Sequence, residues 1–246
     1  MLSAKDQIEV WKKVTSTSQL LDAVSNMNST DVREISALRK TWSAEEVRVA
    51  IELVRARKSA LGRLDHADSV VGDVEGVQQS SSSAVAKWKA NRFKDCAQIV
   101  DLCCGIGGDL LHLSDKATGV DIDPLRCWMA KQNTGKEVSC EDVREFRGVA
   151  NATILLDPSR RDATGKRLDL DKMQPNIAEV QTISANAVGG CVKLSPAIEC
   201  EDVAGIGDCR EVEFIEDRGR VTQGIVWFNS LATANTEVTA TSLKIG

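Results

Sequence analysis

The stretch at residues 98–109, QIVDLCCGIGGD, constrains the fold of this chain more than any other feature. An apolar run contains an acid, Asp101, and then turns through the glycines at 105, 107 and 108. The apolar residues that follow, from Leu110, have the pattern of a helix start. A strand, a glycine turn and a helix in this order begin a nucleotide-type βα unit. Glycines permit positive φ and a close approach of a ligand to the main chain, so a ligand site is predicted at this turn.

Strand and helix patterns alternate from residue 98 onward. Strands are predicted at 99–103, 117–121, 137–140, 153–157 and 190–194, and helices at 108–114, 124–133 and 172–187. This alternation predicts an α/β fold with a Rossmann-like, mostly parallel sheet. The runs at 211–215 and 224–228 are close enough in the chain to form an antiparallel C-terminal hairpin. No element is predicted after residue 230.

Residues 1–94 have helical patterns instead. Helices are predicted around residues 8–14, 20–27, 32–42, 44–62 and 77–93. We therefore expect two domains, a helical one at 1–94 and a sheet-containing one at 95–246. The helical part either supports packing or forms a lid and substrate platform. The second possibility depends on a cluster of basic residues just before the glycine turn, namely Lys87, Lys89, Arg92 and Lys94.

Composition excludes several classes of protein. The chain has 246 residues, a net charge of −5 and eight cysteines. No apolar run is long enough for a membrane span, and the first residues lack a signal-peptide pattern. No two cysteines have Cys-x-x-Cys spacing, so we expect a reduced, cytoplasmic protein with no disulfide framework and no metal site. The mild acidity argues against coating of DNA, but a local basic face for RNA is compatible with it.

The glycine spacing argues against a dinucleotide ligand. Gly105 and Gly107 fit the Gly-x-Gly-x-x-Gly fingerprint, but Leu110 stands at its third glycine position. A Walker lysine is absent as well. Asp101 would also place negative charge where a pyrophosphate should bind. A ligand with a cationic amine and a sulfonium fits this turn better, which favours S-adenosylmethionine.

Two further acids strengthen this interpretation. Asp121 ends the second predicted strand, where a carboxylate can hold both ribose hydroxyls, and Asp142 follows the third, where it can accept from an adenine amino group. Carboxyl ends of successive parallel strands meet in the crevice where such sheets bind ligands. The alternative is that Asp101, Asp121 and Asp142 are only turn acids or helix caps.

The same residues carry a resemblance to a known family. The motifs DLCCGIGG at 101–108 and VDIDP at 120–124 resemble class I S-adenosylmethionine-dependent methyltransferases, in particular the trimethylguanosine-synthase-like branch. The stretches GVQQ at 76–79, VAKWKANRF at 85–93 and LDPSRR at 156–161 resemble bacterial methyltransferases with a C-terminal THUMP-like domain. In that group a further C-terminal domain usually follows the part that this chain matches. The resemblance implies cofactor contacts from Asp101, Cys103, Gly105, Gly107, Asp121, Ile122, Asp142 and Asp157, with Ile122 packing on the adenine.

The turn after the fourth strand, DPSRRD at 157–162, stands where methyltransferases carry their catalytic motif. Methyl transfer from a sulfonium is an in-line displacement that depends on alignment more than on acid–base power. Asp157 and the carbonyl of Pro158 can accept hydrogen bonds from an amine and aim its lone pair. Arg160 stands where amino-methyltransferases have an aromatic residue, and it can stack on a base or pair with a phosphate. Arg92 and Arg161 are further candidates for substrate contacts.

An Asp-Pro-x-Arg turn also resembles the 5-methyluridine enzymes, which use a nucleophilic cysteine after the fifth strand. In this chain that place holds Lys193-Leu194-Ser195-Pro196, with no cysteine. Four basic residues after Pro158 are expected to form either a substrate-binding loop over the mouth of the site or a solvated loop: Arg160, Arg161, Lys166 and Arg167.

The sequence therefore predicts an S-adenosylmethionine-dependent methyltransferase that acts on RNA, at a base amino group rather than at carbon. The alternatives are a methyltransferase for a small molecule or a protein, and a non-catalytic S-adenosylmethionine-binding module that serves as an RNA-binding or assembly factor.

Overall fold

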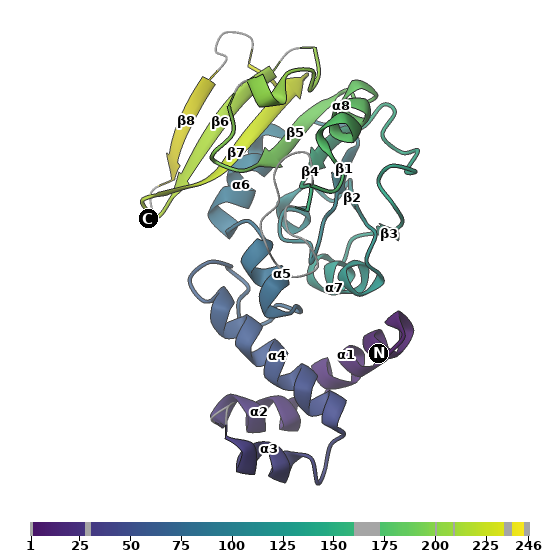
Figure 1. Cartoon of the computed structure of the whole chain (residues 1–246), viewed down its shortest axis with the longest axis vertical. Coiled ribbons are helices and arrows are strands. Elements are labelled where there is room, and N and C mark those ends of the chain that lie inside the picture. Colours follow the sequence, from purple (N-terminus) through teal and green to yellow (C-terminus); the bar gives the residue numbers. More distant parts are fainter. Residues whose placement is uncertain are drawn as a thin grey trace.

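The computed structural model describes residues 2–27, 31–159, 173–199, 201–208, 210–233 and 238–243. Within these residues, a single sheet has the strand order β3-β2-β1-β4-β5-β7-β6-β8 (Figure 1). The strands are β1 (Ile99–Leu102), β2 (Ala117–Asp121), β3 (Val138–Cys140), β4 (Thr153–Leu156), β5 (Gly189–Leu194), β6 (Arg210–Asp217), β7 (Arg220–Asn229) and β8 (Val238–Leu243).

The strand directions confirm the predicted sheet. The five strands from β3 to β5 are parallel to their neighbours, whereas β7 pairs antiparallel with both β5 and β6. The β6–β7 pair is the predicted C-terminal hairpin. Strand β8 pairs parallel with β6 and was not predicted. Its residues are only exposed or half-buried, so its sequence has no strong apolar alternation.

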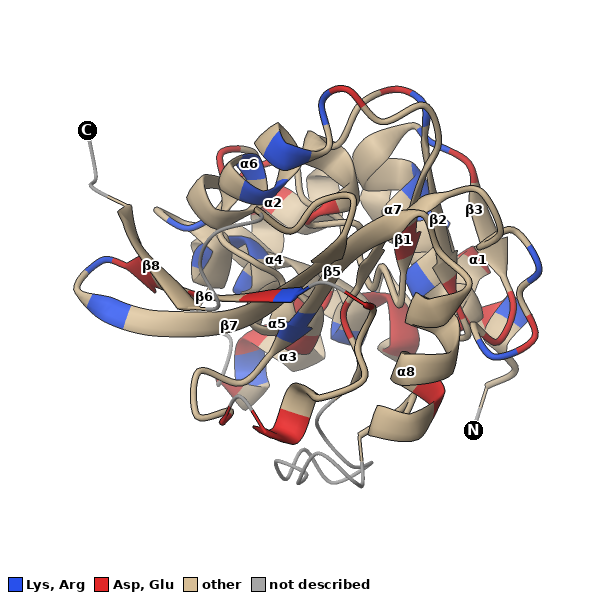
Figure 2. Ribbon diagram, turned by 90° about the horizontal axis from the view of Figure 1, so that it is seen from above, with Lys and Arg blue, Asp and Glu red and all other residues tan. Residues whose placement is uncertain are grey.

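Helices cover both faces of the sheet, as the view from above shows (Figure 2). On one face, α8 (Ile177–Ala185) packs through Val180 and Ile183 on a core that includes Leu102 and Leu156. On the other face lie α6 (Ser83–Arg92) and α7 (Pro124–Thr134). Because side chains alternate along a strand, the side chains of Ile99 and Asp101 lie on the α6 and α7 side.

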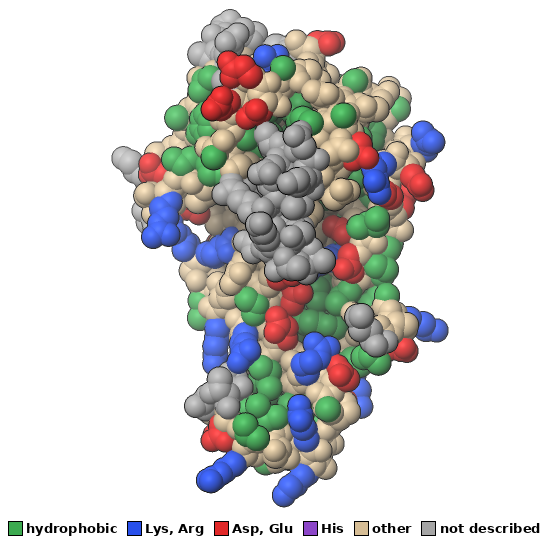
Figure 3. Space-filling view, viewed as in Figure 1, with side chains coloured by type: hydrophobic (Ala, Val, Ile, Leu, Met, Phe, Trp, Pro, Cys, Tyr) green, Lys and Arg blue, Asp and Glu red, His purple; other side chains and the backbone are tan. Residues whose placement is uncertain are grey.

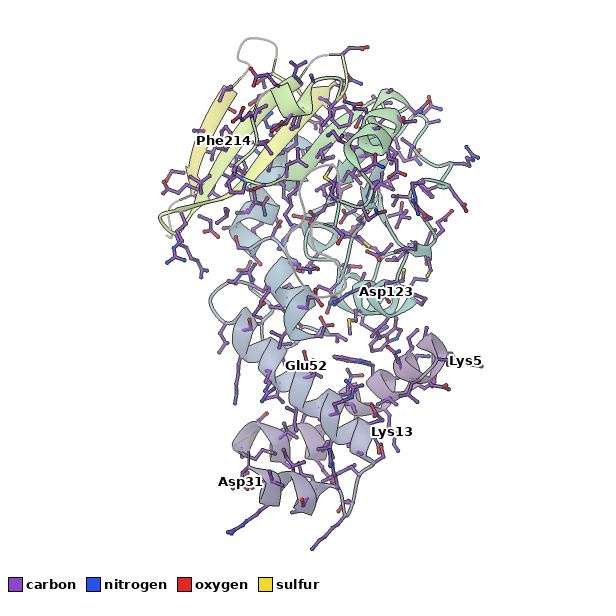
Figure 4. The ribbon with its side chains drawn as sticks, in the orientation of Figure 1. Lys5, Lys13, Asp31, Glu52, Asp123 and Phe214 are labelled. Atoms are coloured by element: carbon purple, nitrogen blue, oxygen red, sulfur yellow. The ribbon has the colours of Figure 1, made fainter. Side chains whose placement is uncertain are left out.

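The remaining helices extend from the middle of the molecule to the end opposite β6 and β8 (Figure 1). They are α1 (Ala4–Thr15), α2 (Ser18–Asn26), α3 (Val32–Leu38), α4 (Ala44–Ala60) and α5 (Val74–Gln79). Their shared core extends to Met129 of α7. Glu52 of α4 accepts a hydrogen bond from the backbone N–H of Val74 at the start of α5, and Figure 4 shows Glu52 midway along α4. No helix in the described part of the chain is long and apolar enough to cross a membrane.

The predicted helix at 77–93 is wrong in one respect that concerns the site. The structure has two helices there: α5, capped by Asp73, begins at Val74, three residues before the predicted start, and Ser80 then leaves the helix with extended backbone. Ser82 caps the next helix, α6, by accepting from the N–H of Val85. The serines at 80–82 thus form the turn between the two helices.

The predicted helix at 108–114 is also wrong. The structure has a single 3₁₀ turn there, η1 (Leu110–His112). Two successive glycines precede it, and glycine is a poor helix former. Leu110 and Leu113 are already buried in the core that α6 and the sheet share, so a longer helix is not needed to bury these two side chains.

Other helix ends differ by a few residues. The helix predicted at 172–187 begins at Ile177, because Asn176 and Glu179 form a capping box; Lys172 lies outside the described residues. The predicted helix at 32–42 ends at Leu38. The predicted starts of the helices at 44 and 124 are confirmed, because Ser43 and Glu46 form a capping box before α4 and Asp123 caps α7, at whose start it lies in Figure 4. The division into domains at 1–94 and 95–246 stays a prediction.

Candidate active site

The register of the parallel strands brings four side chains to one level of the sheet. Leu102 of β1 pairs with Val120 of β2 and with Leu156 of β4, which in turn pairs with Val192 of β5. The next residues along these four strands are, in spatial order, Asp121, Cys103, Asp157 and Lys193. Asp101 lies inside β1, one residue before Leu102, and its side chain is on the α6 and α7 side of the sheet.

A pocket of about 770 Å³ opens at this row, within the usual size range of small-molecule sites. At one end it is lined by the glycine turn and the carboxyl ends of β2 and β3, including Asp101, Cys103, Gly105, Asp121, Ile122 and Asp142. At the other end it is lined by the α5–α6 turn and the carboxyl ends of β4 and β5, including Ser80, Ser81, Asp157, Pro158 and Lys193. Eight predicted site residues therefore line one pocket.

The glycine turn is close-packed on its outer side and open toward the pocket. Gly105 has φ of +57°, and a Cβ there would have no atom within 4 Å. At Gly107, with φ of +86°, a Cβ would lie 2.8 Å from Cγ2 of Thr134 in α7. At Gly108 a Cβ would lie 2.9 Å from Cβ of Ser80. Gly107 therefore packs on α7 and is not among the residues that line the pocket, and its predicted cofactor contact stays a prediction.

Asp121 lies at the end of β2 and holds the turn. Its Oδ2 accepts from the N–H of Gly105 at 2.8 Å, and its Oδ1 accepts from the N–H of Asp123 at 3.0 Å. The carboxyl group is buried, and burial raises the pKa of Asp121 although these two hydrogen bonds lower it in part. Both carboxylate oxygens are thus fixed in orientation at the pocket wall.

Asp101 is buried without a partner. It is 1% exposed, and neither of its carboxyl oxygens has a hydrogen bond from any described residue. Burial raises the pKa of Asp101 well above its ordinary value, and the nearby carboxylates of Asp109 and Asp157 raise it further, whereas Lys89 and Lys193 act in the opposite direction. A buried acceptor without a donor is costly, so this carboxyl is suited to a ligand that brings donors or positive charge.

A second buried carboxylate, Asp109, is fully engaged on one oxygen. Its Oδ2 accepts from Nζ of Lys89 at 2.6 Å and from Oγ of Ser81 at 3.0 Å. Lys89 is fully buried and also donates to Ser81, which accepts from Nε2 of Gln223 in β7 at 2.9 Å. Burial opposes both charges, but their mutual attraction prevails, so the pKa of Lys89 is raised and the pKa of Asp109 is lowered. This network fixes the α5–α6 turn against the sheet.

Asp157 and Lys193 form an ion pair in the pocket. Nζ of Lys193 donates to Oδ2 of Asp157 at 2.6 Å and to the backbone oxygen of Gln79, the last residue of α5, at 3.1 Å. The side chain of Lys193 is only 4% exposed, whereas that of Asp157 is 25% exposed. The predicted catalytic acid therefore lies at the pocket with one oxygen held by a buried cation.

The other predicted cofactor residues line the same end of the pocket as the glycine turn. Ile122 is 65% exposed and is available for contact with a planar group. Asp142 pairs with Arg144, whose Nε lies 2.9 Å from each carboxylate oxygen, and this pair lowers the pKa of Asp142. Cys103 has positive φ, 60°, which is uncommon for a residue with a side chain.

The basic cluster before the glycine turn is dispersed, and it does not form one solvated face. Arg92 lies outside the pocket, where its guanidinium binds Glu211 of β6 at 2.8 and 3.0 Å and stacks 4.3 Å from the ring centre of Trp227. Lys87 pairs with Asp65, and Lys89 is buried as described above. The predicted substrate contact of Arg92 is therefore not among the residues that the structure brings together. Four predicted loop residues lie outside the described residues: Arg160, Arg161, Lys166 and Arg167.

Sequence reasoning missed several residues of the pocket, above all Lys193 and Ser81. A lysine inside an apolar run is a detectable signal, because lysine is rarely buried unless it is paired. Ser81 carried no such signal, since a serine run before a helix is typical of an N-cap. Cys191 is fully buried in β5, and burial raises the pKa of its thiol, which is unfavourable for a nucleophile. Among the described residues, no three His, Cys, Asp or Glu side chains are placed to hold a metal ion.

Comparisons with known proteins agree with this geometry. The chain matches no family model. Over 210 residues it is 30% identical to two proteins of Mycobacterium tuberculosis, from strains CDC 1551 / Oshkosh and ATCC 25618 / H37Rv, which are both named uncharacterized S-adenosylmethionine-dependent methyltransferase. The alignment covers 80% of this chain and 58% of each relative, so the chain spans little more than half the length of these relatives.

A solved structure supports the fold assignment. A protein of Porphyromonas gingivalis W83, assigned as a methyltransferase, has a TM-score of 0.68 and 16% sequence identity, with coverage of 100% of this chain and 64% of that chain. At this identity the likeness concerns the fold alone. The chain is thus similar in sequence to S-adenosylmethionine-dependent methyltransferases and has a methyltransferase fold.

Proposed function

We propose that this chain binds S-adenosylmethionine at the carboxyl ends of β1, β2 and β3 and transfers its methyl group to an acceptor held between β4, β5 and the α5–α6 turn. The observation that carries the proposal is the buried carboxyl of Asp101, which has no hydrogen bond from any described residue, beside a glycine turn that is open to the pocket. Its unpaired oxygens suit the cationic end of this ligand, and the fixed carboxylate of Asp121 suits its ribose hydroxyls.

The remaining cofactor contacts follow from the pocket lining. We propose that Ile122 packs on the adenine, that Asp142 accepts from the adenine amino group while it is held by Arg144, and that the backbone of Cys103 and Gly105 faces the ligand. When bound, S-adenosylmethionine supplies a methyl group on a positively charged sulfur, which departs as a neutral thioether.

At the other end of the pocket, we propose that Asp157 and the backbone carbonyl of Pro158 orient the acceptor. An in-line displacement requires the acceptor lone pair to point at the methyl carbon, so alignment supplies much of the rate. After transfer, an attacking nitrogen carries one proton more than the product needs, and the carboxylate of Asp157 can accept it. Arg160 and Arg161 are proposed to contact the substrate.

We propose that the acceptor is RNA and that the methylated site is a base amino group. We also propose that the protein is cytoplasmic and belongs to the THUMP-like branch. Figure 3 shows Lys and Arg side chains spread over the helical end of the molecule. Five exposed Lys and Arg residues of α1 to α5 and their connecting turns have no ion pair with any described residue, namely Lys5, Arg33, Arg39, Lys40 and Lys58. Such side chains can neutralise backbone phosphates.

One observation favours the alternative acceptors, a small molecule or a protein. No aromatic side chain lines the pocket within the described residues, and the stretch at 160–172 contains none in its sequence. Extruded bases are commonly stacked on aromatic side chains. Arg160 would have to supply this stacking if the acceptor is a base.

Transfer of labelled methyl groups tests the proposed acceptor. Total RNA from a strain that lacks the protein should accept label from S-adenosylmethionine in the presence of the chain, and one nucleoside should carry all of it. Label in small molecules or protein, with none in RNA, would favour the alternative acceptors. Binding of S-adenosylmethionine without transfer to any fraction would favour the non-catalytic module.

A further inference from the structure

Lys193 is a charged residue in a strand that is otherwise apolar and fully buried, and it faces the pocket. An isolated buried cation is expensive, and a buried ion pair can often be replaced by apolar residues without loss of stability. Stability alone therefore does not explain a lysine at this position. Its location beside Asp157 suggests a role toward the ligand.

The backbone places this lysine securely. Lys193 is paired with Ile225 of β7 on one side, and it follows Val192, which is paired with Leu156 of β4 on the other. The same parallel register places Asp157 directly beside it. The hydrogen bond from Nζ to the oxygen of Gln79 adds a contact to the end of α5. The ammonium group is thus fixed by three elements.

The two side chains have unused hydrogen-bonding capacity. An ammonium group has three N–H donors, and two of those of Lys193 are occupied within the described residues, by Asp157 and Gln79. Only Oδ2 of Asp157 has a partner there; Oδ1 has none. One donor and one acceptor are therefore adjacent at the same pocket wall.

We propose that Lys193 and Asp157 together recognise an acceptor edge in which an amino group lies next to a ring nitrogen. Asp157 accepts from the amino group that is methylated, and the third N–H of Lys193 donates to the neighbouring ring nitrogen. Adenine, cytosine and guanine each have such an edge. This inference rests on the proposed function, and it extends that function by assigning a recognition residue that fixes which atom faces the methyl group.

Binding of nucleosides without turnover tests the proposal. Calorimetry is performed on the full chain saturated with S-adenosylhomocysteine, which has no methyl group to transfer. The probes are adenosine, cytidine and guanosine, each compared with the deaza analogues in which CH replaces a ring nitrogen next to the amino group. At least one parent nucleoside should bind about ten- to a hundredfold more tightly than its deaza analogue, as expected for loss of a hydrogen bond to a charged group.

Substitutions at Lys193 make the assignment specific. Lys193→Met should bind the parent and the deaza analogue equally, and Lys193→Arg should restore part of the preference because it keeps a charged donor. Lys131→Met, at an exposed lysine of α7 that does not line the pocket, is the matched control and should bind as the unsubstituted chain does. The melting temperature shows whether each variant is folded. The comparison of parent and deaza nucleosides on the unsubstituted chain needs no variant. It therefore still tests the ring-nitrogen contact if Lys193→Met is unstable.

Different results overturn different claims. Failure of the unsubstituted chain to bind S-adenosylmethionine or S-adenosylhomocysteine would refute the proposed function. Binding of S-adenosylhomocysteine with no nucleoside bound, or with equal affinity for parent and deaza nucleosides, would refute only the role of Lys193. If Lys193→Met still prefers the parent nucleoside over its deaza analogue, another residue makes the ring-nitrogen contact, and the role of Lys193 is likewise refuted.

Discussion

Asp101 and Asp109 are carboxyls buried close together at the end of β1, but they differ in their partners. Asp109 has Lys89 and Ser81, which offset its loss of hydration. Asp101 has no hydrogen bond from the described residues, so the folded chain favours its protonated form, in agreement with its raised pKa. A site that binds a cation commonly carries such a cost when the ligand is absent.

This difference predicts a pH-dependent effect of Asp101→Asn. Above pH about 4 the unfolded chain releases the Asp101 proton, whereas the folded chain retains it up to its raised pKa. Stability of the unsubstituted chain therefore falls as pH rises through this window, and asparagine removes that dependence. Thermal unfolding should show that Asp101→Asn gains stability relative to the unsubstituted chain as pH rises above about 4, by about 1–3 kcal/mol. If the stability of the two chains varied with pH in parallel, this prediction would be contradicted.

Individual site residues could be predicted where a local pattern identifies them. Asp101 is an acid inside an apolar run that leads into the glycine turn, Asp121 ends such a run, and Asp157 precedes a proline, so each is placed in or at the end of a strand whatever the details of packing. Lys193 is fixed at the site by two partners, Asp157 beside it in the sheet and Gln79, which is 114 positions away in the chain. Such a contact depends on the sheet register and on the α5–α6 turn together.

Elements with strong local signals were predicted well. The α4 helix has a capping box, and α7 has Asp123 and Pro124 at its start. The α5–α6 turn was missed because an N-capping serine run gives the same pattern whether or not a helix precedes it. The 3₁₀ turn η1 was missed because tertiary packing of Leu110, and not helix propensity, determines its conformation.

The capping box of α4 offers a test at this scale. Glu46 accepts from the N–H of Ser43 and pairs with Lys13 of α1, and the pair with Lys13, followed by the bonds to Ser43, lowers the pKa of Glu46 to about 2. Its contribution is therefore present above the ordinary value of 4.5 and is lost as pH falls toward 2.

Ser43→Ala and Glu46→Gln should each destabilise the chain by about 1 kcal/mol at pH 7, which lowers its melting temperature by about 2–4 °C. The effect of Glu46→Gln should shrink below pH 4. Affinity for S-adenosylmethionine should not change, because neither Ser43 nor Glu46 lines the pocket. An unchanged melting temperature, or a large loss of affinity, would show that this cap has a different role.

At the scale of the whole molecule, the site lies where strand order reverses, between β1 with β2 on one side and β4 on the other. Open α/β sheets bind ligands at this position, so the location of the site follows from the βα alternation alone. The contribution of the α5–α6 turn does not follow from it. Arg63, in the turn after α4, donates to the backbone oxygens of Val77 and Ser80, which fixes the α5–α6 turn over the pocket.

The predicted sheet, its antiparallel hairpin and its likeness to methyltransferases are confirmed by the strand order and by the relatives in Mycobacterium tuberculosis. The roles of individual side chains and the acceptor depend on side-chain packing and on the ligands themselves, which no strand pattern encodes. The roles of these side chains and the identity of the acceptor stay predictions, which the binding and methyl-transfer experiments test.

Calorimetry with S-adenosylmethionine and NAD tests the central proposal most directly. The chain should bind S-adenosylmethionine and not NAD. Asp121→Ala should weaken this binding by about 1–3 kcal/mol, because it removes a charge-assisted pair of hydrogen bonds to the ribose. Asp22→Ala, at an exposed acid of α2, should bind as the unsubstituted chain does. Tight binding of NAD without binding of S-adenosylmethionine, or an affinity unchanged by Asp121→Ala, would contradict the proposed site.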